Sequence, residues 1–351
     1  MIETFREQVR AAAANGGKLR IRGGGTKDWY GQSLAGEILD TREHRGIVDY
    51  EPTELVITAR CGTPLAEIEA VLAEQNQMLA FEPPHFGDNA TFGGAIAAGL
   101  SGPRRANSGA LRDFVLGAEL LDGKGELLRF GGQVMKNVAG YDVSRLLAGS
   151  LGMLGLITQA SVKVLPRPFA ETTLRFEMSE IDAIRKLNEW GGQPLPVSAS
   201  CWHAGVLALR LSGAQAAVDA AVRSLGGQVM PDCAAFWTSL REQQHAFFAG
   251  DGDDNTALWR LSLPSTTGAV VLKGEQLIEW GGAQRWLRAG SEACDAIRRT
   301  VTAAGGHATL FRGGDQSVGV FQPLAPAVAR IHERLKASFD PAHIFNPGRM
   351  V

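Results

Sequence analysis

Two glycine-rich segments that start about sixty residues apart constrain this chain more than any other feature. The first runs from Leu19 to Gly31 (LRIRGGGTKDWYG), and the second runs from Phe81 to Gly117 (FEPPHFGDNATFGGAIAAGLSGPRRANSGALRDFVLG). A bound diphosphate needs several backbone N–H donors that converge on its oxygens, and glycine lets the backbone approach closely and adopt positive φ angles. Together, the two segments predict a nucleotide cofactor whose diphosphate is held by backbone amides.

The first segment places Gly23, Gly24, Gly25 and Thr26 directly after a strand predicted at 18–22. Its spacing is not G-x-G-x-x-G and no helix clearly follows it, so it fits a Rossmann dinucleotide turn poorly. Because isolated glycine loops are weak signals, a plain glycine turn is an equally good interpretation of this segment taken alone.

The second segment is more specific. It opens with Pro83-Pro84, supplies polar groups at 88–91, and then places Gly93-Gly94 ahead of a run of small residues. Small residues allow a backbone to lie against a flat ring or a phosphate. Near the end of the segment, Arg112 and Asp113 could face a ligand, but a structural ion pair between them is the favoured interpretation.

A third stretch, Lys136–Thr158 (KNVAGYDVSRLLAGSLGMLGLIT), repeats this pattern. It places Gly140-Tyr141-Asp142 ahead of a predicted helix and then runs through 149–155 into a strand that starts at Leu156. Backbone amides are again brought to a turn before a strand.

Composition excludes several classes of protein. The chain has 351 residues, which suits two domains of roughly 100–200 residues each, and its 45% hydrophobic content can bury a real core. A formal net charge of −2 offers no electrostatic footprint for nucleic acid. The N-terminus lacks the apolar region of a secretory signal, and no run of roughly 18 apolar residues occurs, so we expect neither a signal peptide nor a membrane span.

Metal chemistry is also unexpected. The four cysteines are Cys61, Cys201, Cys233 and Cys294, and none forms a C-x-x-C pair, which favours free thiols in a reducing compartment over an iron–sulfur cluster or structural zinc. The seven histidines are His44, His85, His203, His245, His307, His332 and His343. They show no H-x-H, H-x-x-x-H or H-E-x-x-H spacing, so no metal ligand set is predicted.

Periodicity and turn signals predict alternating elements in the first half. A short amphipathic helix is expected to end near Asn15-Gly16, and Asp122-Gly123 is expected to join a hairpin. Strands are predicted at 18–22, 47–50, 54–59, 115–121, 126–130 and 156–164, with a helix at 63–76.

Beyond Pro168 the glycine clusters become rarer, and six of the seven tryptophans occur there. Strands are predicted at 172–176, 198–202, 206–211, 257–263, 269–272 and 308–311, and helices at 179–190 (with Ser179 as N-cap), 214–225, 291–304 and 325–338. This order indicates an α+β domain with an antiparallel sheet. We expect domains at 1–168 and 169–324, followed by a C-terminal helix and tail at 325–351.

The three glycine-rich stretches, in this order, resemble the FAD-binding domain of the vanillyl-alcohol oxidase/PCMH flavoprotein family. Within it, the chain is similar to the FAD-binding subunits of bacterial glycolate oxidases. The motifs that carry the resemblance are RGGGTKxWYG, PPHFGDxATFGGAIAxGLSGPRR, GxxRDFVLG, MKNVAGYDVSRLLAGSLGxLGLIT, GEQLIEWGGAQRWL and the terminal FNPGRM. The resemblance implies an α+β fold: a PCMH-type FAD-binding domain of two α+β subdomains, an α+β cap domain with an antiparallel sheet, and a C-terminal tail that returns to the FAD domain.

The resemblance also implies roles for individual residues. The loop at 22–26 would cradle the FAD pyrophosphate, 88–94 would support the pyrophosphate and ribityl chain, and 152–157 would lie along the adenosine half. The implied cofactor-binding residues are Arg22, Gly23, Gly24, Gly25, Thr26, Pro84, Asp88, Ala90, Thr91, Gly93, Gly94, Gly152, Gly155 and Ile157. Because the first loop holds no His or Cys, the FAD is expected to be noncovalent.

The candidate catalytic residues are His85, Lys136 and Arg349. The resemblance implies that Lys136 and the tail at 346–349 approach the flavin ring. His85 lies inside the second glycine-rich segment and could face the flavin, although a histidine that only packs in a loop is at least as good an interpretation.

The leading functional hypothesis is an FAD-binding subunit of a complex that oxidises glycolate, a small 2-hydroxy acid, to glyoxylate. The implied partners are a catalytic FAD subunit and an iron–sulfur subunit, in a cytoplasmic assembly peripheral to the inner face of the membrane. The scattered histidines favour an alternative, a non-catalytic structural or electron-relay subunit that binds FAD. A stand-alone FAD-dependent dehydrogenase for another 2-hydroxy acid is the second alternative. Trp280 and Trp286 would either line a substrate or subunit interface or pack in the core.

Overall fold

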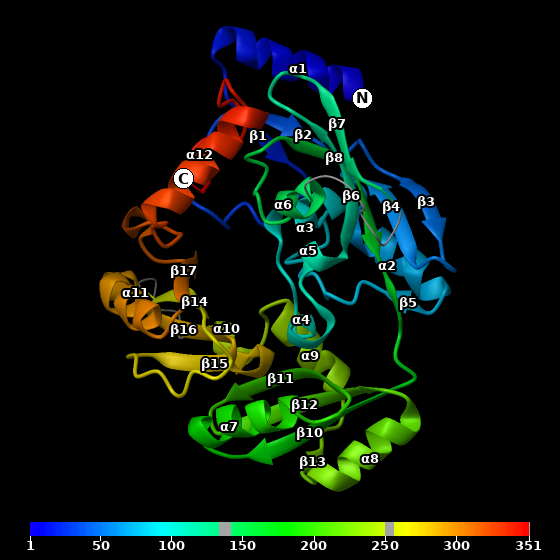
Figure 1. Cartoon of the computed structure of the whole chain (residues 1–351), viewed down its shortest axis with the longest axis vertical. Helices are drawn as coiled ribbons and strands as arrows, with labels where there is room; N and C mark the ends of the chain where they lie inside the picture. Colours follow the sequence, from blue (N-terminus) through cyan, green and yellow to red (C-terminus); the bar gives the residue numbers. More distant parts are fainter. Residues whose placement is uncertain (133–141, 250–255, 351) are drawn as a thin grey trace. The chain divides into compact units, whose positions relative to one another are not determined.

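The computed structural model describes residues 1–132, 142–249 and 256–350. The chain divides into two compact units. Unit 1 comprises Met1–Ser101, Ala110–Pro166 and Pro323–Val351, and unit 2 comprises Gly102–Gly109 and Arg167–Gln322. The chain therefore passes between the units four times, as can be followed in Figure 1. The short excursion at 102–109 is a feature that the sequence had not indicated.

Unit 1 is built on a five-stranded antiparallel sheet in the order β3-β4-β8-β6-β7. Its strands are β3 (Ile47–Glu51), β4 (Val56–Arg60), β6 (Val115–Leu121), β7 (Leu127–Gly131) and β8 (Leu156–Lys163). Two small sheets accompany it: β1 (Leu19–Arg22) with β2 (Glu37–Asp40), and β5 (Gln77–Met78) with β9 (Leu165–Pro166). The β6–β7 hairpin is the predicted one, and the Asp122 carboxylate closes its turn by accepting hydrogen bonds from the amides of Lys124 (2.9 Å) and Glu126 (2.8 Å).

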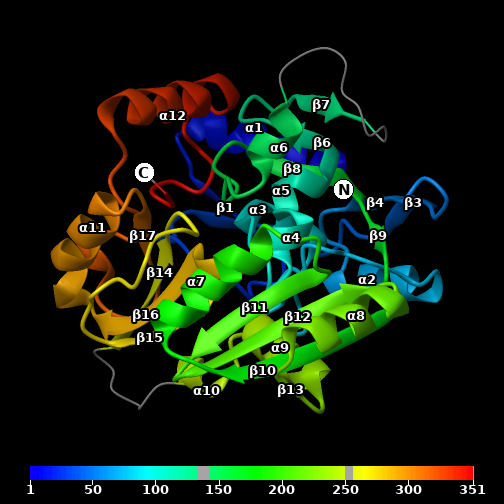
Figure 2. The ribbon, with the colours of Figure 1, turned by 60° about the horizontal axis from the view of Figure 1, so that its bottom comes forward.

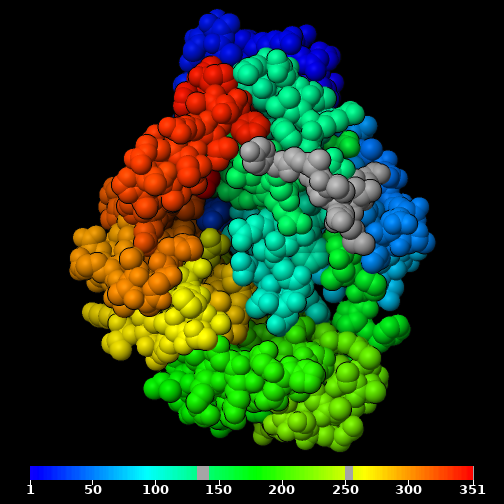
Figure 3. All heavy atoms as spheres, viewed as in Figure 1, coloured from blue at the N-terminus to red at the C-terminus, as the bar shows by residue number. Residues whose placement is uncertain are grey.

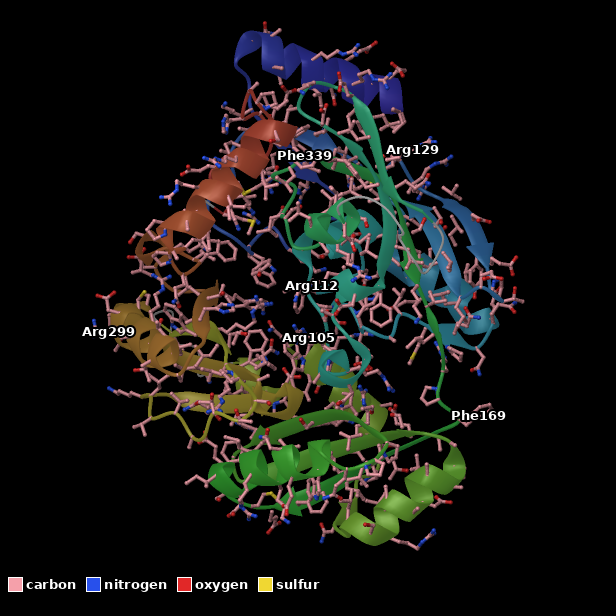
Figure 4. The ribbon with its side chains drawn as sticks, viewed as in Figure 1. Arg105, Arg112, Arg129, Phe169, Arg299 and Phe339 are labelled. Carbon is pink, nitrogen blue, oxygen red and sulfur yellow. The ribbon has the colours of Figure 1, made fainter. Side chains whose placement is uncertain are left out.

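Helices bury the main core of unit 1 against this sheet, and a separate helix packs in a second cluster. The main core is covered by α2 (Leu65–Glu74), α3 (Phe92–Ala98), α5 (Leu111–Phe114), α6 (Val143–Leu147) and α12 (Pro326–Phe339). Helix α1 (Ile2–Asn15) buries Phe5 and Val9 in the second cluster, with residues of β1 and β2. Helix α2 buries Leu65, Ile68 and Leu72 completely, as its periodicity predicted. Helix α12, red in Figure 3, lies at the surface, and its Phe339, labelled in Figure 4, packs against Phe130 with ring centroids 6.1 Å apart.

Unit 2 contains an eight-stranded sheet in the order β13-β10-β12-β11-β15-β16-β14-β17, with every pairing antiparallel. Its strands are β10 (Ala170–Glu177), β11 (Val197–His203), β12 (Val206–Gly213), β13 (Gln228–Val229), β14 (Thr256–Ser262), β15 (Glu275–Glu279), β16 (Gln284–Gly290) and β17 (His307–Arg312). Its helices are α4 (Arg105–Ser108), α7 (Glu180–Gly191), α8 (Gln215–Leu225), α9 (Cys233–Arg241), α10 (Ala246–Ala249) and α11 (Cys294–Ala303). Helices α7 and α8 cover one face of this sheet (Figure 2). The antiparallel α+β character predicted for this region is confirmed.

Helix starts in unit 2 follow local chemistry. The Ser179 hydroxyl accepts a hydrogen bond from the Asp182 amide at 3.2 Å, so the predicted N-cap of α7 is confirmed.

The strand predicted at 269–272 is wrong, because these residues form no strand and the next strand of the chain is β15. Strand β16 was missed, and a fully buried Arg285 in its interior breaks the apolar pattern of a buried strand. Its guanidinium is satisfied by the carbonyls of Gly268 (2.8 Å) and Thr267 (2.5 Å).

The structure decides between the interpretations that the sequence left open for the Arg112–Asp113 pair and for two tryptophans. The favoured Arg112–Asp113 ion pair is absent among the described residues, since the Asp113 carboxylate instead accepts from the Ala110 amide at 2.9 Å. Trp286 is a buried core residue whose indole donates to Glu279 at 2.7 Å. Trp280 donates to the carbonyl of Gly102 at 3.1 Å, and the Arg105 guanidinium lies over its ring at 4.5 Å, so Trp280 holds the excursion at 102–109 within unit 2.

No helix in the part of the chain that the structure describes is long and apolar enough to cross a membrane.

Candidate cofactor-binding site

The first glycine loop follows β1 directly. Gly25 has a φ angle of 74°, and a β-carbon on Gly24 would lie 1.5 Å from the carbonyl oxygen of Asn89. The reason for glycine at position 24 is therefore backbone contact with the second glycine-rich segment. The amides of Gly23, Gly24 and Gly25 donate to no other described residue. They remain able to bond to the oxygens of a ligand.

The second segment contributes small residues from α3. The Thr91 hydroxyl caps this helix by accepting a hydrogen bond from the Gly94 amide at 3.3 Å. A β-carbon on Gly93 would lie 2.5 Å from the β-carbon of Cys61, so the helix packs tightly on the turn after β4. Ala97 and Ala98 continue the same lining. The absence of larger side chains here leaves an open groove beside the first loop.

The third segment forms the opposite wall. Leu151 and Gly152 both adopt positive φ angles, at 50° and 71°, and Gly155 follows at 149°. Leu151 pays a conformational cost for this geometry, and such non-glycine residues cluster at ligand sites. A β-carbon on Gly155 would lie 2.7 Å from the Leu121 carbonyl, so this glycine permits close packing on β6. Ile157, the second residue of β8, also lines the groove.

The C-terminal tail completes the lining of the groove. The Asn346 side chain bonds to the Ile21 amide and to the Leu151 carbonyl, and Arg349 bonds to the backbone of the first loop. The Arg349 guanidinium donates to the carbonyls of Asp28 (2.7 Å), Gln32 (3.3 Å) and Lys27 (3.4 Å). Burial lowers the pKa of this guanidinium, while the Asp28 carboxylate opposes that effect. Its visible bonds all brace the loop backbone, and a catalytic role for Arg349 stays a prediction.

The groove is electropositive. Its charged lining consists of four basic side chains, Arg20, Arg22, Lys27 and Arg349, and one acidic side chain, Asp28. Arg20 and Arg22 both bond to the same carboxylate oxygen of Asp28, at 2.5 and 2.8 Å. This arrangement orders the two arginines while leaving an excess of positive charge. An anionic ligand such as a diphosphate would be attracted to it.

The structure brings most of the sequence-predicted cofactor residues together. Lining one groove are Arg22, Gly23, Gly24, Gly25, Thr26, Thr91, Gly93, Gly94, Gly152, Gly155 and Ile157. Three others lie outside its lining: Pro84 and Ala90 are buried, and Asp88 is exposed. Ala90 belongs to the hydrophobic core, where its carbonyl accepts from the Leu65 amide at 2.8 Å. For these three residues, cofactor contact stays a prediction.

Of the other two candidate catalytic residues, the structure places His85 only. Lys136 lies outside the described residues. The imidazole Nε2 of His85 lies 3.2 Å from a carboxylate oxygen of Glu69, and the His85 carbonyl accepts from Lys27 at 3.2 Å. His85 is therefore tied to the first loop through its backbone, while its ring faces α2.

Sequence reasoning missed several lining residues: Arg20, Ile21, Lys27, Asp28, Leu34, Thr41, Cys61 and Leu151. Ala97, Ala98 and Leu156 were not named individually, although they lie in the predicted run of small residues and in the predicted segment 152–157. The charges that flank the glycines, Arg20, Lys27 and Asp28, were the available signal. Thr41 and Cys61 come from other turns, and nothing in their local sequence marks them.

Outside the groove, the fold pairs two histidines that the sequence left scattered. In unit 2, the rings of His203 and His245 are 5.4 Å apart, and His203 lies 2.7 Å from a Glu275 oxygen. No group of three metal-ligating side chains is positioned to hold a metal ion within the described ranges.

Comparison with known proteins identifies the family. Residues 2–131 match the model of the FAD binding domain family. The chain is 52% identical over 344 residues to the glycolate oxidase subunit GlcE of Escherichia coli (strain K12), covering 98% of this chain and 95% of that protein. The chain belongs to the GlcE family of glycolate oxidase subunits. It is thus an oxidoreductase subunit with an FAD-binding domain, and the PCMH-type fold is confirmed.

More distant relatives of this GlcE family member match only part of each chain. The glycolate oxidase subunit GlcD of Bacillus subtilis (strain 168) is 34% identical over 149 residues, which is 42% of this chain and 31% of GlcD. A D-lactate dehydrogenase of Archaeoglobus fulgidus is 32% identical over 185 residues, 51% of this chain and 40% of that enzyme. Among solved structures, alkyldihydroxyacetonephosphate synthase shares the fold, with a TM-score of 0.65 at 15% identity over 98% of this chain and 74% of that one.

The residues present fit FAD. The free amides at 23–25 and the basic lining suit its diphosphate, and the small residues of α3 leave room for a backbone-sized chain beside them. When bound, FAD supplies a two-electron acceptor, while the protein supplies binding and orientation.

Proposed function

We propose that this chain is the FAD-binding subunit of a complex that oxidises glycolate to glyoxylate. The observation that carries the proposal is the electropositive groove, in which three segments and the C-terminal tail meet around unpaired loop amides. The identity to GlcE over nearly the full length supports glycolate as the substrate. The shorter matches to GlcD and to a D-lactate dehydrogenase support 2-hydroxy acids as the substrate class.

In the proposed reaction, glycolate gives up a hydride from its alcohol carbon and a proton from its hydroxyl. These losses, two electrons and two protons in total, leave glyoxylate. A side chain must accept the hydroxyl proton, and His85 and Lys136 are the candidates. Arg349 carries a positive charge and would instead orient the substrate carboxylate.

We propose that FAD is bound noncovalently. The loop from Arg20 to Gly31 contains no histidine or cysteine. Among the described lining residues, Cys61 is the one cysteine, and burial raises the pKa of its thiol to about 12. A thiol that stays protonated is a poor nucleophile toward a flavin. Acid precipitation should therefore release all flavin into the supernatant.

The partners we propose are a catalytic FAD subunit and an iron–sulfur subunit, in a cytoplasmic assembly peripheral to the inner face of the membrane. The name of the GlcE relative, a subunit of an oxidase, supports an assembly of this kind. Affinity purification of the chain at native expression level should recover both partners, and a high-salt wash should release them together from membranes.

The deciding experiment uses the purified chain alone and records its visible spectrum before and after anaerobic glycolate. Bleaching of a flavin spectrum would mean that this subunit holds its own active site. A flavin that stays oxidised with the chain alone, but bleaches when the partners are added, would favour the structural or electron-relay role. Full turnover with a dye acceptor and D-lactate, without partners, would instead favour the stand-alone dehydrogenase.

A further inference from the structure

We infer that Asn346 is a positioning residue that holds the two loops of the groove at the separation that FAD requires. This inference rests on the proposed cofactor site. It extends that site to a residue more than 300 positions away from the first glycine loop and outside the segment that matches the FAD binding domain family.

The backbone of the tail lies alongside β1. The Leu19 amide donates to the Ile344 carbonyl at 2.7 Å, and the Asn346 amide donates to the Leu19 carbonyl at 2.8 Å. Leu19 and Phe345 form a parallel bridge, so the tail acts as an added strand beside β1. In Figure 1 the red tail after α12 can be followed back to the blue strand β1.

The side chain of Asn346 connects the two walls of the groove. Its Oδ1 accepts a hydrogen bond from the Ile21 amide at 2.8 Å, and its Nδ2 donates to the Leu151 carbonyl at 2.6 Å. Ile21 is two residues before the first glycine, and Leu151 directly precedes Gly152. One amide group therefore fixes both loops, and each of its two ends bonds to a different one.

The local geometry admits few other residues. Asn346 has a φ angle of 41°, in the left-handed region that asparagine tolerates better than most residues. A β-carbon on Gly152 would lie 2.6 Å from Nδ2 of Asn346, so the absence of a side chain at 152 makes room for the asparagine amide.

The tail that carries Asn346 is itself anchored. The buried Asp340 carboxylate accepts hydrogen bonds from the amides of Ile344 (3.0 Å) and Phe345 (2.9 Å). The Lys336 ammonium donates to the carbonyls of Phe345 (2.8 Å) and Met153 (2.6 Å). Asn346 thus projects from a rigid support, and such a support is what keeps a binding geometry within about 0.5 Å.

Two variants of Asn346 test its two side-chain hydrogen bonds. Asn346→Gly removes both side-chain hydrogen bonds and keeps the positive φ angle favourable. Asn346→Asp keeps an acceptor for the Ile21 amide but loses the donor to Leu151. The matched control is Gln77→Ala: Gln77 is a buried amide in unit 1 outside the groove, with hydrogen bonds to the Pro52 carbonyl and the Tyr50 hydroxyl, both 2.9 Å.

The experiment measures two properties of the full chain. Hydrogen exchange of the apoprotein reports the order of the segments around Ile21 and 151–155 without any cofactor. Titration with FAD, followed by flavin fluorescence, gives the dissociation constant. We expect Asn346→Gly to speed exchange in both segments and to weaken FAD binding by about tenfold or more, the effect of losing buried hydrogen bonds. Asn346→Asp should fall between this variant and wild type, and Gln77→Ala should bind FAD within about twofold of wild type.

Unchanged exchange in Asn346→Gly would overturn the inference, and so would faster exchange with an unchanged dissociation constant. A loss of FAD affinity as large in Gln77→Ala would also overturn it, because the effect would then reflect general destabilisation. A wild-type chain with no affinity for FAD would refute the proposed cofactor site and with it the role of Asn346 in FAD binding. The exchange data would still show separately whether Asn346 orders the loops.

Discussion

The ammonium group of Lys336 lies 2.6 Å from the carboxylate of Asp340, and both side chains are buried. Burial lowers the pKa of the lysine, and the bond to Asp340 opposes that effect. The pair survives in the interior because each group has further hydrogen-bond partners, the lysine on two carbonyls and the carboxylate on two amides.

Removing one member of this pair should destabilise the protein strongly. Lys336→Met leaves a buried carboxylate without its cation, which costs about 3–5 kcal/mol. The measurement is the free energy of unfolding in urea. Arg145→Met is the control, because its ion pair with Asp142 (3.0 Å) is exposed and contributes about 0–1 kcal/mol. Equal losses in the two variants would contradict this account of the anchor.

Gly24→Ala should separate the two glycine-rich segments. Its β-carbon would meet the Asn89 carbonyl oxygen at 1.5 Å, and neither backbone can yield without moving its loop. We expect FAD affinity to fall by about a hundredfold or more, measured by fluorescence titration. Gly191→Ala is the control, since nothing lies within 4 Å of its β-carbon position. Wild-type flavin content in Gly24→Ala would remove the first loop from the cofactor site.

Binding of FAD should weaken as salt concentration rises. The groove carries four basic side chains and one acidic one, and exposed charges are screened within about 10 Å at 0.1 M salt. The dissociation constant for FAD should rise several-fold between about 0.05 and 0.5 M salt. Riboflavin lacks phosphates, so its weaker binding should respond little. The same salt response for both ligands would show that the basic lining does not contact the diphosphate.

Stability should fall on mild acidification. Burial lowers the pKa of His245 from its usual 6.5, and the neighbouring His203 lowers it further. The unfolded chain therefore binds more protons than the folded one just below pH 6.5, so the free energy of unfolding decreases as the pH falls through that window. His245→Gln should give a shallower fall in melting temperature between about pH 7 and pH 5. A residual slope is expected, because burial also lowers the pKa of His44 and His307.

Local signals predicted much of the fold. The spacing of Leu65, Ile68 and Leu72 gave α2, and Ser179 gave the start of α7. Those features depend on neighbours within a few residues, so one stretch of sequence contains them. Strand β16 contains the buried Arg285, whose carbonyl partners on Gly268 and Thr267 lie 17 and 18 residues earlier. Strand β15 ends at the buried Glu279, which accepts a hydrogen bond from Trp286 in the neighbouring strand. A local apolar pattern could not reveal them.

The candidate site also combines features that the local sequence predicts with contacts that it does not. Glycines marked three segments of the groove, because glycine is required where the backbone turns tightly or where another segment approaches it closely. The tail was expected near the flavin ring, but neither its hydrogen bonds to Ile21 nor those to Leu151 could be predicted. A side chain that joins two loops produces no periodic pattern in the sequence. Only the three-dimensional structure shows that Asn346 fits between them.

The return of the tail to β1 has a consequence for biosynthesis. Asn346 and Arg349 line the groove beside the loop at 20–31, and they are translated more than 300 residues after that loop. During synthesis the first sheet can form before the tail exists, but the lining of the groove stays incomplete until residue 349 has been made. A chain released before that point would keep its glycine loops and lack the two side chains that brace them.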